Sequence, residues 1–407
     1  IVALPLMTPW MLKRVSGLIH PGAFDFAYGV RTLGVKLGTT SFAVAAVGVA
    51  VTMLVGITLM VGSFRKTLEV WIGSTIRADV YVTSESWRRA RGTATLDDDL
   101  VAALVRFPGV RAADRLRQGF AWTGSRRISL IGRDAGLPGG DGRFPLVSGN
   151  RAEAIRRMVS EGAVLIGEPL ARKERLRPGD RLRLATSGGE AEFPIAGVYY
   201  DYSDENGSAE MDLSAMERAY GPGGITNVDL YLAPGVDTEA TMDALRERFR
   251  GVPLEILDKR GLRDEIMAIF DQTFAVTRLL QGMALLIAAL GITLTLLVLA
   301  RERTAELALY RALGAGRWQI FRVFLGEGIG MGALGLALGL PGGTALAAIL
   351  IFVINRAYFG WTIAPSAPVL ALSAQAATIL AAAAIASVYP ALRASRTSAA
   401  ELSRDDL

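Results

Sequence analysis

Four long stretches without a charged residue constrain this chain more than any other feature. They comprise 37–64, 279–300, 328–355 and 357–392. A helix of about 20 apolar residues crosses the hydrocarbon core of a bilayer, so each stretch is long enough to span it. In the last stretch, Pro365 and Pro368 favour a short loop before a helix at about 369–391. The sequence therefore predicts four membrane-spanning helices.

The composition adds a second, water-exposed part. Hydrophobic residues make up 51% of the 407 residues, and the mean hydropathy is +0.34, although 20% of the residues are charged. This mixture is typical of a membrane protein with a sizeable aqueous portion. Cysteine is absent and His20 is the one histidine, which excludes disulfides, Cys/His metal sites and cysteine nucleophiles.

The distribution of positive charge predicts the orientation. Lysine and arginine gather in 13–36, in the loop 301–327 with its five arginines, and in the tail after Leu392. A four-span topology places these segments on one side, which the positive-inside rule assigns to the cytoplasm. The short loop on the other side has Arg356, with Tyr358 and Trp361 as expected interface anchors, whereas Arg65 and Lys66 run against the trend. The net charge of +5 is explained in this way, and no nucleic-acid partner is expected.

The long insertion 65–272 is expected outside the cytoplasm. Two units that combine helix and strand patterns begin near 97 and near 227. They flank a β-rich insert at about 160–200, whose short alternating runs and Pro-Gly-Asp turn favour a small barrel or sandwich-like lobe. The insertion is therefore predicted to be an α+β domain.

Acidic residues in YYDYSDENGSAEMD raise the question of chemistry in this domain. The cluster comprises Asp201, Asp204, Glu205 and Glu210. Carboxylates can bind a cation or act as acid and base, but this spacing fits no calcium loop, so a solvated acidic loop is the favoured interpretation. The insertion has no histidine, and Ser84 and Ser208 lack a nucleophile context. We expect no catalytic or metal site, and a binding or docking role for the domain.

Glycines in the third stretch match a nucleotide-binding pattern by accident. Gly330, Gly332 and Gly335 have the GxGxxG spacing, but they lie inside an uncharged run and not between a strand and a helix. Small residues four apart let membrane helices approach closely, which predicts helix packing at Gly328 with Gly332 and at Gly335 with Gly339. The phosphate-binding pattern GxxxxGK[ST] is absent, so a partner must bind any ATP that is used.

The stretch LARERTAELALYRALGAGRWQIFRVFLGE resembles the cytoplasmic loop of the FtsX/MacB superfamily of ABC transporter permeases. The family pattern falls on Glu306, Arg311, Ala312, Leu313, Gly314, Ala315 and Glu327. The tail YPALRASRTSAAEL resembles the family's closing segment at Pro390, Ala391 and Ala394, and EGAVLIGEPLARKERLRPGDRLRL resembles its periplasmic domain. The order of one span, a large external domain and three spans also matches.

The resemblance implies that this loop couples the membrane helices to a separate ATPase. The coupling residues it indicates are Glu306, Arg311, Ala312, Leu313, Gly314, Ala315, Arg317, Trp318, Phe321 and Arg322. Gly314 and Gly316 would let the chain reverse, the arginines would pair with an acidic groove, and the apolar side chains would anchor. The alternative is a loop whose arginines only obey the positive-inside rule, with Trp318 at the membrane interface.

The start of the chain, IVALPLMTPW, lacks the order of regions found in a signal peptide. We expect residues 1–12 to be the end of an upstream membrane helix, with a short interfacial helix as the alternative. The stub resembles the junction in tandem permeases, which implies the C-terminal half of a larger protein. The expected order is an upstream helix at 1–12, a linker at 13–37, spans at 38–64, 273–300, 323–355 and 369–392, the external domain at 65–272, a coupling loop at 301–322, a short external loop at 356–368 and a tail at 393–407.

The fold class expected is therefore a membrane α-helical protein of four spans plus an N-terminal stub, with an α+β extracytoplasmic domain between the first and second full helices. The resemblance implies the permease subunit of an ABC transporter in the bacterial inner membrane, which moves a lipid, lipoprotein, peptide or drug. The alternative is a sensing or mechanotransmission subunit that activates a cell-wall hydrolase or detects an antimicrobial peptide. The implied partners are an ATP-binding subunit dimer holding ATP and magnesium, a second permease half, membrane lipid and a periplasmic accessory protein, with no cofactor in this chain.

Overall fold

The structure is a computed structural model that describes residues 8–14, 26–33, 37–85, 94–137, 144–148 and 150–396. It divides the chain into two compact units, each described here by itself. The helical unit takes Ile1–Phe64, Thr273–Ile351 and Pro365–Leu407, and the α+β unit takes Arg65–Gln272 and Phe352–Ala364.

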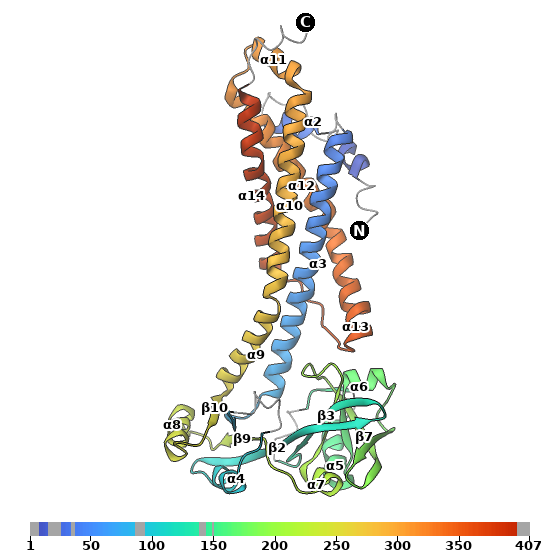
Figure 1. The fold of residues 1–407 in the computed structure, drawn as a ribbon, viewed down its shortest axis with the longest axis vertical. Helices are drawn as coiled ribbons and strands as arrows, with labels where there is room; N and C mark the ends of the chain where they lie inside the picture. Colours follow the sequence, from blue (N-terminus) through green and yellow to red (C-terminus); the bar gives the residue numbers. More distant parts are fainter. Residues whose placement is uncertain are drawn as a thin grey trace. The chain divides into compact units, whose positions relative to one another are not determined.

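The long helices confirm the four predicted spans (Figure 1). The described helices before the first strand and after the last one are α2 (Phe26–Thr32), α3 (Leu37–Thr75), α9 (Lys259–Thr273), α10 (Ala275–Glu302), α11 (Thr304–Ala312), α12 (Arg317–Ile349), the π-helical turn η2 (Leu350–Ile354), α13 (Asn355–Tyr358) and α14 (Val369–Ser395). The segments long and apolar enough to cross a membrane are Gly38–Thr75, Lys259–Glu302, Arg317–Tyr358 and Val369–Ser395. Residues 8–14 are also helical, while 1–7 of the predicted upstream helix lie outside the described residues.

The helical unit is held together by apolar packing around α12. This helix packs against α14, α2 and α10, and α10 packs against α14. Its core includes Val47 and Val51 of α3, Leu296 of α10 and Phe324 of α12. The outward face of α10 stays apolar, with Leu279 71% exposed and its neighbours along the helix similar. Lipid satisfies such a face, so the pattern is that of a membrane bundle and not of a soluble one.

The α+β unit is built on a mixed sheet. Its strands are β1 (Val80–Ser84), β2 (Val110–Thr123), β3 (Arg126–Arg133), β4 (Leu146–Ser148), β5 (Val164–Gly167), β6 (Arg181–Thr186), β7 (Gly189–Tyr199), β8 (Ser208–Asp212), β9 (Asn227–Leu232) and β10 (Leu254–Asp258). The order is β10-β1-β9-β2-β3-β8-β5-β7-β4, and β6 pairs with β7. The pairs β3–β8 and β5–β7 are parallel, and the others are antiparallel. The predicted α+β domain between the first and later membrane helices is confirmed.

Short helices cover the sheet, and side chains cap four of them. They are α4 (Asp98–Val105), α5 (Arg151–Glu161), α6 (Glu168–Lys173), α7 (Leu213–Tyr220) and α8 (Thr238–Arg248). Asp97, Asn150, Asp212 and Asp237 each precede a helix and accept a hydrogen bond from a backbone N–H of its first turn. These caps satisfy N–H groups that have no partner inside the helix, which fixes where each helix begins.

The β-rich insert predicted at 160–200 does not build its apolar core from its own strands alone. Its strands β5, β6 and β7 share one apolar core with β2, β3 and β8, including Ile128 and Leu130 of β3 and Ala209 and Met211 of β8. The strand β6 lies against β2 without pairing with it, which closes this core. The alternating pattern shows which face of a strand is buried but not which distant strand covers it, so the partners from outside the insert were not visible in the sequence.

Candidate functional site

The segment between α10 and α12 forms a tight helical hairpin. The chain leaves α11 through Gly314, whose φ of +97° lies in the left-handed region that favours glycine. The Ala315 N–H donates to the Tyr310 carbonyl (2.9 Å) and the Gly314 N–H to the Arg311 carbonyl (3.1 Å). These two bonds are those of a Schellman motif, which ends a helix and reverses the chain. Arg311 braces the same turn, because its Nη1 donates to the Ala315 carbonyl at 2.7 Å.

Beyond the turn, the hairpin presents an apolar and basic surface. Leu313 is 78% exposed and Trp318 is 66% exposed. The Trp318 ring stacks on Phe321 with centroids 4.9 Å apart. Arg317 and Arg322 are exposed, and neither makes an ion pair within the described part of the chain. We call Leu313, Arg317, Trp318, Phe321 and Arg322 the hairpin surface.

At the base of the hairpin lies a buried ion network. Arg303, in the junction between α10 and α11, is 7% exposed, and Glu327 of α12 is 1% exposed. Nη1 of Arg303 donates to Oε1 of Glu327 at 2.6 Å, while its Nε and Nη2 donate to the two oxygens of Glu306 at 2.8 Å each. Burial alone would lower the pKa of Arg303, but Glu306 and Glu327 outweigh it, so the pKa lies above its usual value. The guanidinium is therefore a permanent charge that links α11 to α12.

Hydroxyl groups extend this network to α2. Thr32 donates to Oε1 of Glu327 at 2.6 Å, and Tyr310 donates to Oε1 of Glu306 at 2.5 Å. The Tyr28 and Tyr310 hydroxyls lie 3.0 Å apart. Burial, followed by the bonds to Glu306 and Tyr28, raises the pKa of Tyr310, so it remains a hydrogen-bond donor. A cavity of about 240 Å³ adjoins these side chains, and Oε2 of Glu327 has no hydrogen-bond partner among the described residues.

The family resemblance had pointed to Glu306 and Glu327 as pattern positions, but not to a buried network. Arg303, Thr32 and Tyr310 were missed as their partners. Arg303 and Glu306 are three apart, a spacing that brings side chains together on one helical face and was available as a signal. Thr32 and Glu327 are 295 residues apart, so no local pattern could pair them.

The predicted packing glycines divide between two neighbouring helices. A Cβ on Gly328 would lie 1.6 Å from Oγ of Ser387, and one on Gly332 would lie 2.7 Å from Ala383, both in α14. A Cβ on Gly335 would lie 2.4 Å from Val47 in α3. Similar contacts repeat one turn and two turns later, in the pairs Gly339–Val51 and Gly343–Val55. The backbone of α12 thus lies so close to α14 and α3 that a methyl group would clash.

The α+β unit holds a second buried ion cluster, centred on Arg133 of β3. This side chain donates to Asp114 of β2 (2.8 Å) and lies 3.4 Å from Glu210 of β8 and 3.9 Å from Asp229 of β9. Burial would lower the pKa of Arg133, but the three carboxylates raise it above its usual value. Burial is also the main reason why the pKa of Glu210 is raised.

The interpretation of 201–210 as a solvated acidic loop is wrong for two of its residues. Asp201 is 3% exposed and Glu210 is 7% exposed. Asp201 accepts hydrogen bonds from Ser203 and from Ser208, and Ser208 also contacts the Tyr199 hydroxyl at 2.7 Å. Among the described residues, no group of histidine, cysteine or carboxylate side chains has a metal-binding arrangement. Asp201 and Glu210 belong to buried polar networks of this unit, through their bonds to serines and to Arg133.

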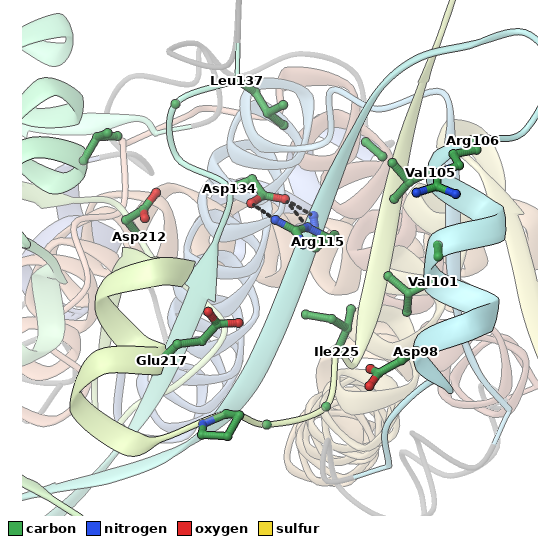
Figure 2. Close-up of a pocket in the computed structure, with 17 residues that line it drawn as sticks. Asp98, Val101, Val105, Arg106, Arg115, Asp134, Leu137, Asp212, Glu217 and Ile225 are labelled. Atoms are coloured by element: carbon green, nitrogen blue, oxygen red, sulfur yellow. Dashed lines mark hydrogen bonds and ion pairs between the residues drawn. The ribbon is translucent and has the colours of Figure 1, made fainter.

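A broad cleft of about 980 Å³ opens on the same unit. Figure 2 shows Asp98 and Val101 of α4 on one side of it and Glu217 of α7 on the other, with Arg115 and Asp134 between them. Arg115 and Asp134 form an exposed pair at 2.8 Å. The mixture of apolar and charged lining suits a protein or peptide surface better than a small apolar ligand.

Comparison with known proteins decides the family. A model of the FtsX-like permease C-terminal region matches residues 279–399. A model of the MacB-like periplasmic core domain matches residues 40–248, just over half of the chain. The chain belongs to the FtsX/MacB family of ABC transporter permeases. It is thus a multi-pass protein of the bacterial inner membrane with a periplasmic-type domain, and its family implies an ATPase partner.

Individual relatives of the permease agree with the family models. It is 30% identical over 372 residues to the ABC transporter permease protein Rv0987 of Mycobacterium tuberculosis, covering 89% of this chain and 44% of that protein. It is 27% identical over 194 residues to the macrolide export ATP-binding/permease protein MacB of Bdellovibrio bacteriovorus, covering 45% of this chain and 29% of that protein. The permease spans less than half the length of these two curated relatives.

Two solved structures are similar at a lower level. The periplasmic region of MacB from Actinobacillus actinomycetemcomitans matches with 13% identity and a TM-score of 0.34, covering 48% of this chain and 95% of that one. The extracellular domain of the transporter YknZ from Gram-positive bacteria matches with 13% identity and a TM-score of 0.31, covering 44% and 99%. At these scores they add no argument to the family models.

Proposed function

We propose that the permease transmits ATP-driven motion from a separate ATPase subunit, through the hairpin 301–322, to its extracytoplasmic domain. That motion would extract or export a hydrophobic or amphiphilic substrate such as a lipid, lipoprotein, peptide or drug. The observation that carries this proposal is the hairpin surface. Trp318 and Leu313 are apolar and exposed, and Arg317 and Arg322 beside them have no ion-pair partner among the described residues.

A surface of this composition is typical of a docking site. Aromatic and arginine side chains dominate the binding energy of protein interfaces, and exposed apolar groups gain when a partner covers them. The structure also separates two kinds of arginine in the hairpin. Arg311 serves the turn and Arg303 serves the buried network, whereas Arg317 and Arg322 remain available for an acidic groove.

The buried network supports transmission of the motion. A push on α11 acts on Glu306, and the charge-assisted bonds of Arg303 carry it to Glu327 of α12. The close contact of α12 with α3 and α14 then ties the other spans to the same movement. A hairpin of this kind is therefore equipped to move several helices together.

The cargo is inferred from the character of the spans. The stretches 37–64, 279–300, 328–355 and 369–392 contain no charged residue. Polar and ionisable side chains mark aqueous pathways through membrane proteins, so their scarcity favours cargo taken from the bilayer over transport through a water-filled channel. One relative is named for macrolide export. The cleft in Figure 2 offers a surface for a periplasmic accessory protein, and a second permease half and a dimer of ATPase subunits complete the proposed assembly.

ATPase activity of the full-length permease, copurified with its candidate ATP-binding subunit in lipid nanodiscs, tests the proposal. Arg317→Glu and Trp318→Ala are expected to weaken binding of the subunit by about 2 kcal/mol each, roughly 30-fold, and to abolish stimulated hydrolysis. Arg393→Glu, which changes an exposed arginine at the end of α14, is the matched control. Gly314→Leu, which strains the turn, is expected to have the same effect as the two surface variants.

Unchanged association and hydrolysis in all three hairpin variants would reduce the hairpin to a positive-inside loop. ATP-dependent release of a lipid or acylated peptide from the same nanodiscs separates transport from signalling. If hydrolysis requires the hairpin but no cargo is released, the permease acts as a mechanotransmission subunit and not as a transporter.

A further inference from the structure

A small apolar pocket of about 290 Å³ lies in the α+β unit. The last turns of α3 form one wall, the connection after β7 forms another, and the segment before α14 closes it. The apolar lining is Val70, Trp71, Pro145, Tyr200, Tyr202 and Ala364. The Tyr202 ring packs edge-on against Trp71 (5.8 Å between centroids) and Trp361 (6.0 Å), so the aromatic wall is formed before any ligand enters.

Four hydrogen bonds tie polar groups of these walls to the protein itself. The hydrogen bonds run from Trp71 Nε1 to the Tyr200 carbonyl (2.9 Å), from the Tyr202 hydroxyl to the Thr362 carbonyl (2.7 Å), from the Ala364 N–H to Thr67 Oγ1 (3.0 Å) and from Ser74 Oγ to the Trp71 carbonyl (2.8 Å). The surface that a ligand would meet is therefore almost wholly apolar.

This satisfied lining selects the chemistry of the occupant. A peptide in the pocket would bury backbone N–H and C=O groups without partners, which is unfavourable for each group. An acyl chain has no such groups, and an apolar pocket keeps it out of water once it has left the bilayer. Ligand pockets usually measure about 300–1,000 Å³, so this one suits a single chain and not a pair.

A lysine lies at the mouth. The Lys66 side chain is 62% exposed, and its nearest carboxylate, Glu69, is 3.8 Å away, longer than a hydrogen bond. Its neighbour Arg65 is occupied by Asp271 at 2.7 Å. The Lys66 ammonium can therefore meet an acidic head group while the chain enters the pocket.

The place of the pocket along α3 fits a ligand that leaves the bilayer. The helix has 39 residues and is about 58 Å long, whereas the hydrocarbon core is about 30 Å thick. Lys66 follows the uncharged stretch 37–64 almost directly, and Val70 lies one turn further, 63% exposed. The pocket thus borders the part of α3 that continues beyond the apolar span.

We infer that this pocket binds the acyl chain of a single-chain amphiphile whose acidic head group pairs with Lys66. The inference rests on the proposed function only in treating the acyl chain as cargo. Binding itself needs neither ATP nor the hairpin.

Photolabelling of the full-length permease in phosphatidylcholine nanodiscs tests this site. The probe is palmitate with a diazirine near its methyl end, and mass spectrometry locates the labelled residues. Saturable labelling of 66–74 or 200–202, displaced by unlabelled palmitate, is expected, whereas the lipid-facing side of α10 should label in proportion to probe. Labelling of the pocket that does not saturate would overturn the inference.

Three variants sharpen the measurement. Val70→Asp places a charge in the wall and is expected to weaken saturable labelling at least about tenfold. Val252→Asp makes the same change at an exposed valine outside the pocket and should leave the saturable labelling unchanged. Lys66→Glu should weaken labelling by the acid about fivefold but not labelling by the corresponding fatty alcohol. Equal responses to Val70→Asp and Val252→Asp would overturn the pocket, and equal effects on acid and alcohol would overturn the acidic head group.

Competitors distinguish the sources of the chain. Lysophosphatidylglycerol represents a membrane lipid and N-palmitoyl-glycylglycine an acylated peptide, and the stronger competitor identifies the source. Saturable labelling combined with normal hydrolysis in the hairpin variants would retain the pocket and reject the proposed function. Loss of hydrolysis in those variants without saturable labelling of the pocket would retain the proposed function and reject the pocket.

Discussion

Two buried arginines, one in each unit, make the same kind of ion pairs in different surroundings. Arg133 and Arg303 are each 7% exposed, and each is bonded to carboxylates that are themselves partly or fully buried. The partners of Arg133 lie on β2, β8 and β9, strands that the backbone ladder of the sheet already orders with β3. The partners of Arg303 lie on α11 and α12, which meet through side chains.

The comparison shows how context decides what a buried ion pair does. In the sheet, the cluster adds to an arrangement that main-chain hydrogen bonds fix, so its loss should expose unpaired charge without providing an alternative geometry. In the hairpin, the network is a polar link between helix ends that no sheet ladder holds together. We therefore expect the Arg133 cluster to determine stability and the Arg303 network to determine coupling.

Removing the centre of the sheet cluster should have the largest effect on stability. Arg133→Met leaves Asp114, Glu210 and Asp229 buried without their cation, and breaking a buried pair in this way costs about 3–5 kcal/mol. Hydrogen exchange of β2, β3 and β8 in the full chain measures it. Arg115→Met, which breaks an exposed pair of the same unit, should cost no more than about 1 kcal/mol. Similar exchange in both variants would contradict the importance of burial.

Neutralising the hairpin network should cost less stability but more function. Glu327→Gln keeps an acceptor for Thr32 and Arg303 while removing the charge, and hydrogen bonds to charged groups contribute about 1.5–3 kcal/mol. We expect faster hydrogen exchange confined to α11 and a loss of stimulated ATPase activity of about 5–150-fold, the usual range of allosteric coupling.

Glu302→Gln, which changes an exposed carboxylate at the end of α10, is the control for that variant. If Glu327→Gln unfolds the chain as Arg133→Met does, the two networks have the same role and the distinction between them fails. Normal stimulated ATPase activity and normal hydrogen exchange in Glu327→Gln would equally contradict this distinction.

The smallest effect concerns pH. Burial raises the pKa of Glu210, so its contribution to stability is present below the usual pKa of glutamate and is lost as the pH rises through the raised value. Glu210→Gln cannot ionise, so its stability relative to the wild type should increase over that rise in pH. Thermal unfolding of the full chain at several pH values measures the difference, with Glu190→Gln as the control for an exposed carboxylate. A stability of Glu210→Gln that falls relative to that of the wild type as the pH rises would contradict the direction of the shift.

The spans and the α+β class were predictable because each depends on local patterns. A run without charge identifies a membrane helix regardless of its neighbours, and the Gly-Ala-Gly break at 314–316 predicts a reversal that the left-handed Gly314 performs. The resemblance at 301–328 identified the family, and the family models agree.

The networks were not predictable, because they join residues that only the tertiary fold brings together. Asp201 and Glu210 were interpreted as loop acids because the residues near them, from α3 and from other strands, are remote in sequence. The contact of β6 with β2 is likewise between strands that are far apart in the chain. Arg311 was expected to face a partner, and it braces the turn within reach of its own chain. Whether a charged side chain serves the partner or the fold is decided by geometry that a linear pattern does not contain.

The seam between α3 and α12 also limits how this family can diversify. Gly335, Gly339 and Gly343 each face a valine of α3 at a distance that admits no methyl group. A larger residue at any of these glycines can be accommodated only if the facing valine is replaced by a smaller residue in the same lineage. Orthologous sequences should therefore show compensating pairs across the seam, such as alanine opposite alanine at 339 and 51, and an unpaired enlargement there would mark a lineage in which the helices have separated.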